Sequence, residues 1–120
     1  MASFERFSVV VVPLPLTDRK AEKRRPAVVL SDQMNFGAPA GHSVMAMITS
    51  AMHQPWPLDV VLGDLEAAGL PTPSRVRMKL FTLDHRLVHR QIGKLGAQDQ
   101  KALEKNLKTL FGQHKRKPPP

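Results

Sequence analysis

Two residues of the sequence, Arg25 and Thr49, are of types that could act together on a phosphate group. Arg25 stands directly before Pro26, where a basic segment turns into an apolar, β-branched stretch, and the residue before a proline is restricted to extended backbone. Thr49 ends a second predicted strand. Because side chains alternate along a strand, Thr49 points away from the face of Ala46 and Ile48 and could share a face with Arg25.

An arginine supplies a permanent, planar charge that suits a phosphate, and a hydroxyl can hydrogen-bond a phosphate oxygen or orient an attacking group. Together they would suit cleavage of a phosphodiester by the 2′-hydroxyl of the RNA itself, which needs neither a protein nucleophile nor a metal. The alternative is a solvated arginine pair, Arg24 and Arg25, and a threonine that merely ends its strand. Spacing alone favours this simpler alternative, so the rest of the sequence has to decide.

A second candidate is the segment Arg75–Leu80, in which basic and apolar residues alternate strictly. This pattern predicts a half-buried strand with one cationic face, formed by Arg75, Arg77 and Lys79. Such a face could follow a phosphate backbone, while Trp56 on a loop stacks on a base. An ordinary solvated strand face and a tryptophan that fills the core would produce the same pattern.

Other chemistries find little support in the sequence. His85 and His89 have the i, i+4 spacing of a zinc chelate on a predicted helix, but Arg86 stands where a metalloprotease motif has its glutamate, and no third ligand is suggested. The sequence has no cysteine, no Gly-x-Ser-x-Gly turn and no glycine-rich phosphate loop. We therefore expect no metal and no cofactor.

The charge balance points to a polyanionic partner. Eighteen Lys and Arg residues against ten Asp and Glu give a formal net charge of +8, which favours nucleic acid or an acidic protein segment. The 120 residues suit one domain, which we place at residues 1–112, with a disordered basic tail at 113–120. The longest apolar run, Val9–Leu16, contains two prolines and is too short for a membrane span, so we expect a cytoplasmic protein that does not enter membranes.

The elements that must position these residues are short strands joined by loops. We predict strands at Val9–Val12, Pro26–Ser31, Ser43–Thr49, Leu58–Leu62, Arg75–Leu80 and Gln91–Leu95, a helical turn at Leu65–Ala68, a short helix from Thr82 or Asp84 to about Arg90, and a terminal helix at Ala97–Phe111. Thr17–Arg25 and Asp32–His42 are predicted loops, the first positively charged. Many short strands closed by one terminal helix predict a mainly β fold, either a small barrel or a strongly bent sheet.

Six motifs carry a resemblance to a known family. VPLPLTD (12–18), RRPAVVLS (24–31), ITS (48–50), GLPTPS (69–74), KLFTLD (79–84) and IGKL (92–95) resemble, in order and spacing, the MazF/PemK family of toxin endoribonucleases, particularly its PemK-like branch. The resemblance covers roughly residues 9 to 111. It implies a mainly β (α+β) fold, an SH3-like small β-barrel with a C-terminal helix and one or two short helices. It also implies a homodimer that cleaves single-stranded RNA at short sequence motifs without a metal and is inhibited by a cognate antitoxin.

The resemblance also implies roles for individual residues. In that family the arginine before the proline of the second strand and the threonine of the ITS motif form the catalytic pair, here Arg25, which would stabilise the phosphorane, and Thr49, which would hold a phosphate oxygen. The expected RNA-binding residues are Arg19, Lys20, Lys23, Arg24, Ser50, Trp56, Arg75, Arg77 and Lys79. Two departures stand out. Phe7 and Ser8 replace the usual Gly-Asp pair before the first strand. Met78 stands near the position at which some relatives carry an acidic residue, and the absence of that residue leaves the general base unassigned.

A function of another class stays open at this point. A non-enzymatic barrel that binds nucleic acid, or one that poisons a topoisomerase as structural relatives of this fold do, would carry the same basic surface. Intact RNA with salt-sensitive binding would indicate the first, and inhibited DNA supercoiling the second.

Overall fold

A six-stranded antiparallel sheet organises the structure. The computed structural model describes residues 2–14 and 23–113. The strands are β1 (Ser8–Leu14), β2 (Lys23–Val29), β3 (His42–Ser50), β4 (Val60–Val61), β5 (Ser74–Asp84) and β6 (Arg90–Lys94), and their order across the sheet is β4-β5-β3-β2-β1-β6. The helical elements are a π-helical turn η1 (Gln33–Gly37), α1 (Ala38–Ala40), α2 (Leu65–Ala68), a 3-10 turn η2 (His85–Leu87) and α3 (Ala97–Leu110).

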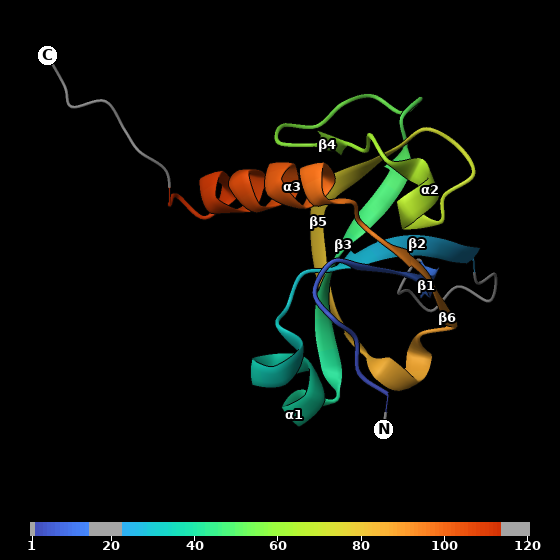
Figure 1. Ribbon diagram of the computed structural model, residues 1–120, viewed down its shortest axis with the longest axis vertical. Helices are drawn as coiled ribbons and strands as arrows, with labels where there is room; N and C mark the ends of the chain where they lie inside the picture. The colour runs from blue at the N-terminus through green and yellow to red at the C-terminus, as the bar shows by residue number, and fades with distance from the viewer. Residues whose placement is uncertain (1, 15–22, 114–120) are drawn as a thin grey trace, which may run out of the picture.

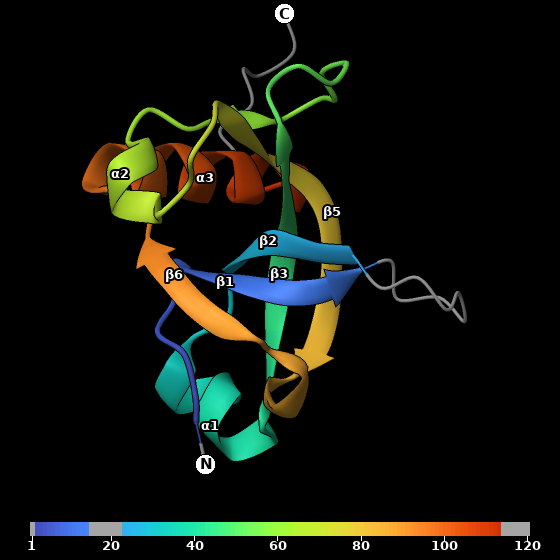
Figure 2. The same ribbon diagram turned by 90° about the vertical axis from the view of Figure 1, so that its right-hand side faces the viewer.

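The sheet is strongly curled. β3 and β5 run steeply across β1, β2 and β6, with α2 and α3 near one end of the curl and α1 near the other (Figure 1, Figure 2). The predicted mainly β fold, an SH3-like barrel with a C-terminal helix and short helices, is confirmed in the form of a half-barrel. Among the described residues, no helix is long and apolar enough to cross a membrane.

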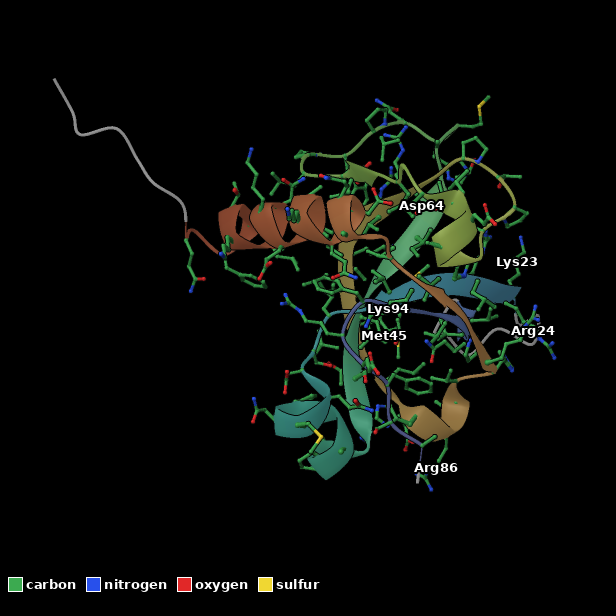
Figure 3. The ribbon with its side chains drawn as sticks, viewed as in Figure 1. Lys23, Arg24, Met45, Asp64, Arg86 and Lys94 are labelled. Carbon is green, nitrogen blue, oxygen red and sulfur yellow. The ribbon has the colours of Figure 1, made fainter. Side chains whose placement is uncertain are left out.

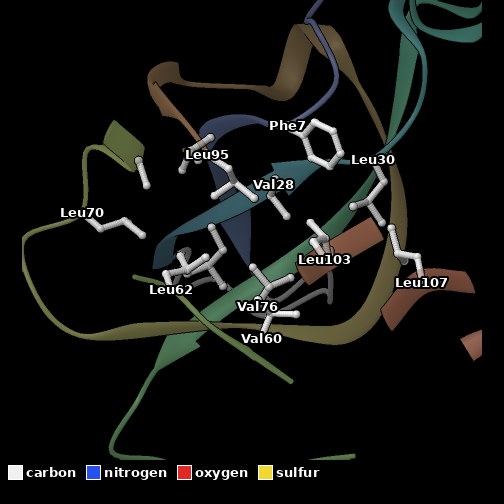
Figure 4. Close-up of a cluster of buried hydrophobic side chains, with 14 residues drawn as sticks. Phe7, Val28, Leu30, Val60, Leu62, Leu70, Val76, Leu95, Leu103 and Leu107 are labelled. Carbon is white, nitrogen blue, oxygen red and sulfur yellow. The ribbon is translucent and has the colours of Figure 1, made fainter. Parts of the chain in front are cut away.

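Apolar side chains pack on both faces of the central strands. The larger cluster joins the sheet to α2 and α3, and Val28, Val76 and Leu103 lie within it (Figure 4). The smaller cluster contains Val10, Val12, Ala27, Val29, Met45 and Leu83. Successive apolar residues of β2 enter different clusters, so this strand is buried on both faces, as its continuous apolar run predicts.

Two glycines let α2 approach β6 and close one side of the curled sheet. Gly69 ends α2 in the left-handed conformation (φ 72°), and a Cβ at this position would collide with the carbonyl group of Ile92. A Cβ at Gly93 would collide in the same way with the carbonyl groups of Ala67 and Ala68. The close approach of the two backbones therefore requires glycine on each side.

Replacing Gly93 with alanine should lower the free energy of unfolding by about 1–3 kcal/mol, the usual range for overpacking a tight contact. Chemical denaturation followed by circular dichroism would measure this loss. Gly63→Ala is a matched control, because its methyl group would meet the Asp99 side chain at an ordinary 3.5 Å, and it should change stability by no more than about 0.5 kcal/mol. Equal denaturation midpoints for the two variants would contradict the tight contact.

The basic residues before Pro26 belong to β2, and the prediction that they end a loop is wrong. The backbone of Lys23, Arg24 and Arg25 pairs with β1, where Arg25 lies opposite Val12. Backbone pairing does not depend on side-chain charge, and all three basic side chains are exposed, so the strand can extend through them.

Other element boundaries also differ from the prediction. β5 is longer, because it pairs with β3 as far as Asp84, and the helix expected after it is only the turn η2. β4 is shorter than the predicted Leu58–Leu62. The predicted loop Asp32–His42 contains η1 and α1; the Asp32 carboxylate caps this turn by accepting a hydrogen bond from the Asn35 N–H (2.8 Å).

β5 carries an irregularity midway along its pairing with β3. Met47 pairs with Arg77, but its neighbour Ala46 pairs with Leu80, which leaves two residues of β5 between them without a partner. Such a bulge normally disturbs the alternation of side chains. Because the number of extra residues here is even, the residues before and after the bulge keep the same faces.

Candidate active site

Three neighbouring strands bring Arg25, Thr49 and Arg75 into one row across the sheet. β3 pairs Thr49 with Arg75 of β5, and β2 pairs Ala27 with Met47 of β3. The β2–β3 pairing ends at Ala27 and Met47, and its register, continued by two residues, would set Arg25 opposite Thr49. Strand alternation puts all three side chains on one face. The two residues predicted to form a catalytic pair therefore occupy adjacent strands and share a face.

The turn after β3 adds a residue that the sequence analysis did not identify. Oγ1 of Thr49 and Nδ1 of His53 are hydrogen-bonded at 2.7 Å, with Thr49 half-buried and His53 exposed. Ser50 holds the turn, because its C=O accepts the His53 N–H and its Oγ accepts the Met52 N–H, each at 3.1 Å. This contact lies outside a helix, so helical spacing could not indicate it. The available signal was Ser50, a residue type that favours turns and that we had expected to bind RNA.

On the predicted cationic face of β5, the loop between β3 and β4 covers the side chains of Arg75 and Arg77. Oδ2 of Asp59 lies 3.5 Å from Nη1 of Arg75 and 3.2 Å from Nη2 of Arg77, and the Asp59 side chain is only 4% exposed. Nη2 of Arg75 also donates to the C=O of Ala51, and Nη2 of Arg77 to the C=O of Gln54, each at 2.6 Å. Both guanidinium groups are thus engaged in holding the loop against the sheet.

Asp59 is ionised within this cluster. Burial would raise its pKa, but hydrogen bonds from Arg77 and from the Trp56 N–H, together with the charges of Arg77 and Arg75, hold the pKa of Asp59 below its ordinary value of 3.8. A carboxylate paired with two arginines cancels part of their charge. Arg75 and Arg77 therefore attract a phosphate less strongly than the sequence pattern suggested.

Trp56 lies on the same loop with an exposed fraction of 45%, which excludes the alternative that it fills the core. Cζ of Arg77 is 4.7 Å, and Nζ of Lys79 is 6.0 Å, from the centroid of its ring. The backbone N–H of Trp56 donates to Oδ2 of Asp59 at 2.9 Å, which fixes the backbone that carries the ring. Trp56 and the exposed Lys79 are thus accessible, as RNA-binding residues must be.

The basic side chains of β2 form a separate exposed group. Lys23 and Arg24 project at the outer end of the strand (Figure 3), and Arg25 is also exposed. Arg19 and Lys20, the remaining expected RNA-binding residues, lie outside the described residues.

Comparison with known proteins places this chain in a family. A family model described as PemK-like, MazF-like toxin of type II toxin-antitoxin system matches residues 5–111. The chain belongs to this family. A search of curated proteins found no significant match.

Solved structures share the fold of this family member. A chain of the MazE-MazF (Form-III) crystal structure from Deinococcus radiodurans is 19% identical, with a TM-score of 0.74 and coverage of 94% of this chain and 100% of that chain. An endoribonuclease in complex with its cognate antitoxin from a mycobacterial species is 16% identical (TM-score 0.73; 97% and 100% covered). The Mycobacterium tuberculosis toxin MazF-mt6 is 23% identical (TM-score 0.69; 88% and 96% covered). At these identities the likeness shows a common fold.

The start of β1, where a departure from the Gly-Asp pair of the family is predicted, has an unusual backbone. Phe7 has a φ of 72°, which lies in the left-handed region that glycine adopts without strain. Its ring is buried, its N–H donates to the Val29 C=O (2.7 Å), and its C=O accepts from the Leu95 N–H (3.0 Å). These contacts hold Phe7 at the entry to the strand.

The two histidines with zinc-chelate spacing occupy separate environments in this toxin-family chain. His85 is buried, with Nε2 2.7 Å from Oγ of Ser43 and Nδ1 3.0 Å from the C=O of Ala2. His89 lies beyond η2 and is exposed. The predicted helix that would have aligned them is wrong. Across residues 2–14 and 23–113, no group of three or more His, Cys, Asp or Glu side chains is placed to hold a metal ion.

Proposed function

We propose that this member of the toxin family is a metal-independent endoribonuclease that cleaves single-stranded RNA. The observation that supports the proposal is the register of β2 and β3, which pairs Ala27 with Met47 and, continued by two residues, would set Arg25 opposite Thr49 on one face of the sheet. In the proposed reaction the 2′-hydroxyl attacks the adjacent phosphorus and the P–O5′ bond breaks, which leaves a 2′,3′-cyclic phosphate and a 5′-hydroxyl. Arg25 would stabilise the negative charge of the phosphorane, and Thr49 would hold a non-bridging oxygen.

The surroundings of the pair support an RNA substrate. Lys23 and Arg24 flank Arg25 on β2, and the net charge of +8 favours attraction of a polyanion. Trp56 and Lys79 would contact a base and a phosphate beyond Thr49. Arg75 and Arg77 would shape this part of the surface by holding the loop that carries Trp56.

Partners follow from family membership as part of the same proposal. Structural relatives include toxins solved with an antitoxin, which supports an antitoxin as the partner of this chain. An acidic antitoxin segment would compete with RNA for the basic residues of β2. We expect the working unit to be a homodimer that acts on cytoplasmic RNA.

The test is incubation of the protein with a long single-stranded RNA in EDTA, with fragment ends identified by mass spectrometry. Cyclic-phosphate ends and 5′-hydroxyls are expected. Thr49→Ala should slow cleavage by about 10²–10³-fold, because one donor to the transition state is removed. Thr82→Ala, at an exposed threonine of β5, is the matched control and should cleave like the wild type.

RNA that stays intact at every protein concentration would refute the nuclease. Inhibited DNA supercoiling would then support topoisomerase poisoning, and salt-sensitive retention of intact RNA would support a binding protein.

A further inference from the structure

His53 is a titratable side chain in direct contact with Thr49, one of the two proposed catalytic residues. Its Nδ1 is hydrogen-bonded to Oγ1 of Thr49 at 2.7 Å, while no hydrogen bond to its Nε2 is found within residues 2–14 and 23–113. The ring is exposed on the turn after β3. A substrate bound at Thr49 would therefore meet a histidine with one free ring nitrogen.

The hydroxyl group of Thr49 restricts the form of this histidine. A hydroxyl has one proton to donate, and the proposed function requires Thr49 to donate it to a phosphate oxygen. Oγ1 must then accept its hydrogen bond from Nδ1–H of His53. In a neutral ring with Nδ1 protonated, Nε2 carries the free lone pair and can accept a proton.

Among the residues that the structure describes (2–14 and 23–113), the other charged groups around His53 do not offer a competing base. Asp59 is paired with Arg75 and Arg77, which makes its carboxylate a poor proton acceptor. Arg75 and Arg77 also donate to carbonyl groups on both sides of His53, those of Ala51 and Gln54, and so fix the turn. From β2, Arg25 faces the same row, and an arginine remains protonated.

We propose that His53 is the general base of the RNA cleavage, an inference that rests on the proposed function. Nε2 of His53 takes the proton from the 2′-hydroxyl while O2′ bonds to phosphorus and the P–O5′ bond breaks. The departing O5′ takes a proton from water, and His53 then releases its proton to solvent. The protein is therefore unchanged after one turnover. Thr49 both positions His53 and binds the phosphate.

The kinetic test compares wild type with His53→Gln over pH 5–8, using a short RNA of known sequence. We expect His53→Gln to lower kcat by about 10²–10³-fold, within the usual range for general base catalysis. The rise of kcat/KM with pH in the wild type should be absent from the variant. Added imidazole should restore part of the activity of His53→Gly. His42→Gln, at the other end of β3, is the control and should match the wild type in rate and profile.

Three outcomes would overturn the inference and leave the proposed function standing. A His53→Gln variant with the wild-type rate would remove the residue from the reaction. A slowed variant that keeps the wild-type pH profile and is not rescued by imidazole would leave His53 a positioning residue. Nitrogen NMR of the free protein that shows Nε2 protonated in neutral His53 would contradict the required tautomer. If the wild type itself leaves RNA intact, the proposed function fails first, and the inference fails with it.

Discussion

Arg25→Ala should reduce the rate of RNA cleavage by about 10³-fold or more, the usual loss when an arginine that stabilises a phosphoryl transition state is removed. Arg25 is exposed in the first half of β2, so the substitution should leave stability within about 0.5 kcal/mol of the wild type. Arg25→Lys keeps the charge but loses the planar fork that binds two phosphate oxygens, and we expect an intermediate rate. Single-turnover cleavage of a short RNA would rank the three proteins.

Arg86→Ala is the control for this series. Arg86 is exposed, pairs with Asp84, and lies well separated from Lys23 and Arg24 at the end of β2 (Figure 3). Its removal lowers the net charge by the same amount as Arg25→Ala. If Arg86→Ala cleaves RNA at the wild-type rate, net charge alone does not explain the lower rate of Arg25→Ala. A folded Arg25→Ala protein that keeps more than about a tenth of the wild-type rate would show that Arg25 lies outside the transition-state contacts.

Asp59→Ala should lower the free energy of unfolding by about 3–5 kcal/mol, because it leaves two largely buried guanidinium groups without their carboxylate. The side chains of Arg75 and Arg77 are 11% and 12% exposed, so water cannot fully replace Asp59. Small domains are stable by only about 5–15 kcal/mol, which makes this a large fraction of the total. Chemical denaturation would measure it. Glu104→Ala, which breaks a partly exposed pair with Arg6, should change stability by less than about 1 kcal/mol, and a similar loss in both variants would contradict the special role of Asp59.

The same cluster should make stability depend on pH. The pKa of Asp59 is lower in the folded protein than its ordinary value of 3.8, so the ionised carboxylate stabilises the fold above that value. This contribution should be lost as the pH falls below about 4. Denaturation measured between pH 3 and pH 6 should therefore show that the free energy of unfolding falls more steeply toward acid pH for the wild type than for Asp59→Asn. Equal slopes would mean that Asp59 titrates alike in the folded and unfolded chains.

Much of the fold and the central pair could be predicted because they depend on regular patterns. Apolar residues recur on one face of Ser43–Thr49 and Arg75–Leu80, and both segments are strands in the structure. Antiparallel pairing of adjacent strands then relates their side chains by simple alternation. This regularity explains why the common face of Arg25 and Thr49 could be expected before the register was known.

The surroundings of that pair could not be predicted, because they depend on an irregular loop. The partner of Arg75 and Arg77 is Asp59, which precedes them by 16 and 18 residues and belongs to no strand. The loop also contains a residue in the left-handed conformation that is not glycine, Leu58 (φ 65°). No periodic pattern encodes such a backbone, so the burial of the two arginines and the contact of His53 with Thr49 became visible only in three dimensions.

The two extra residues of β5, Met78 and Lys79, limit how the chain can change in length. If one of them were deleted, the first half of the strand would turn over relative to the second, which would direct Arg75 and Arg77 toward the apolar cluster that now holds Val76. Deletion of both would leave all the remaining side chains of β5 on their present faces. Insertions and deletions at this point of the strand are therefore compatible with the row of Arg25, Thr49 and Arg75 only when they come in even numbers.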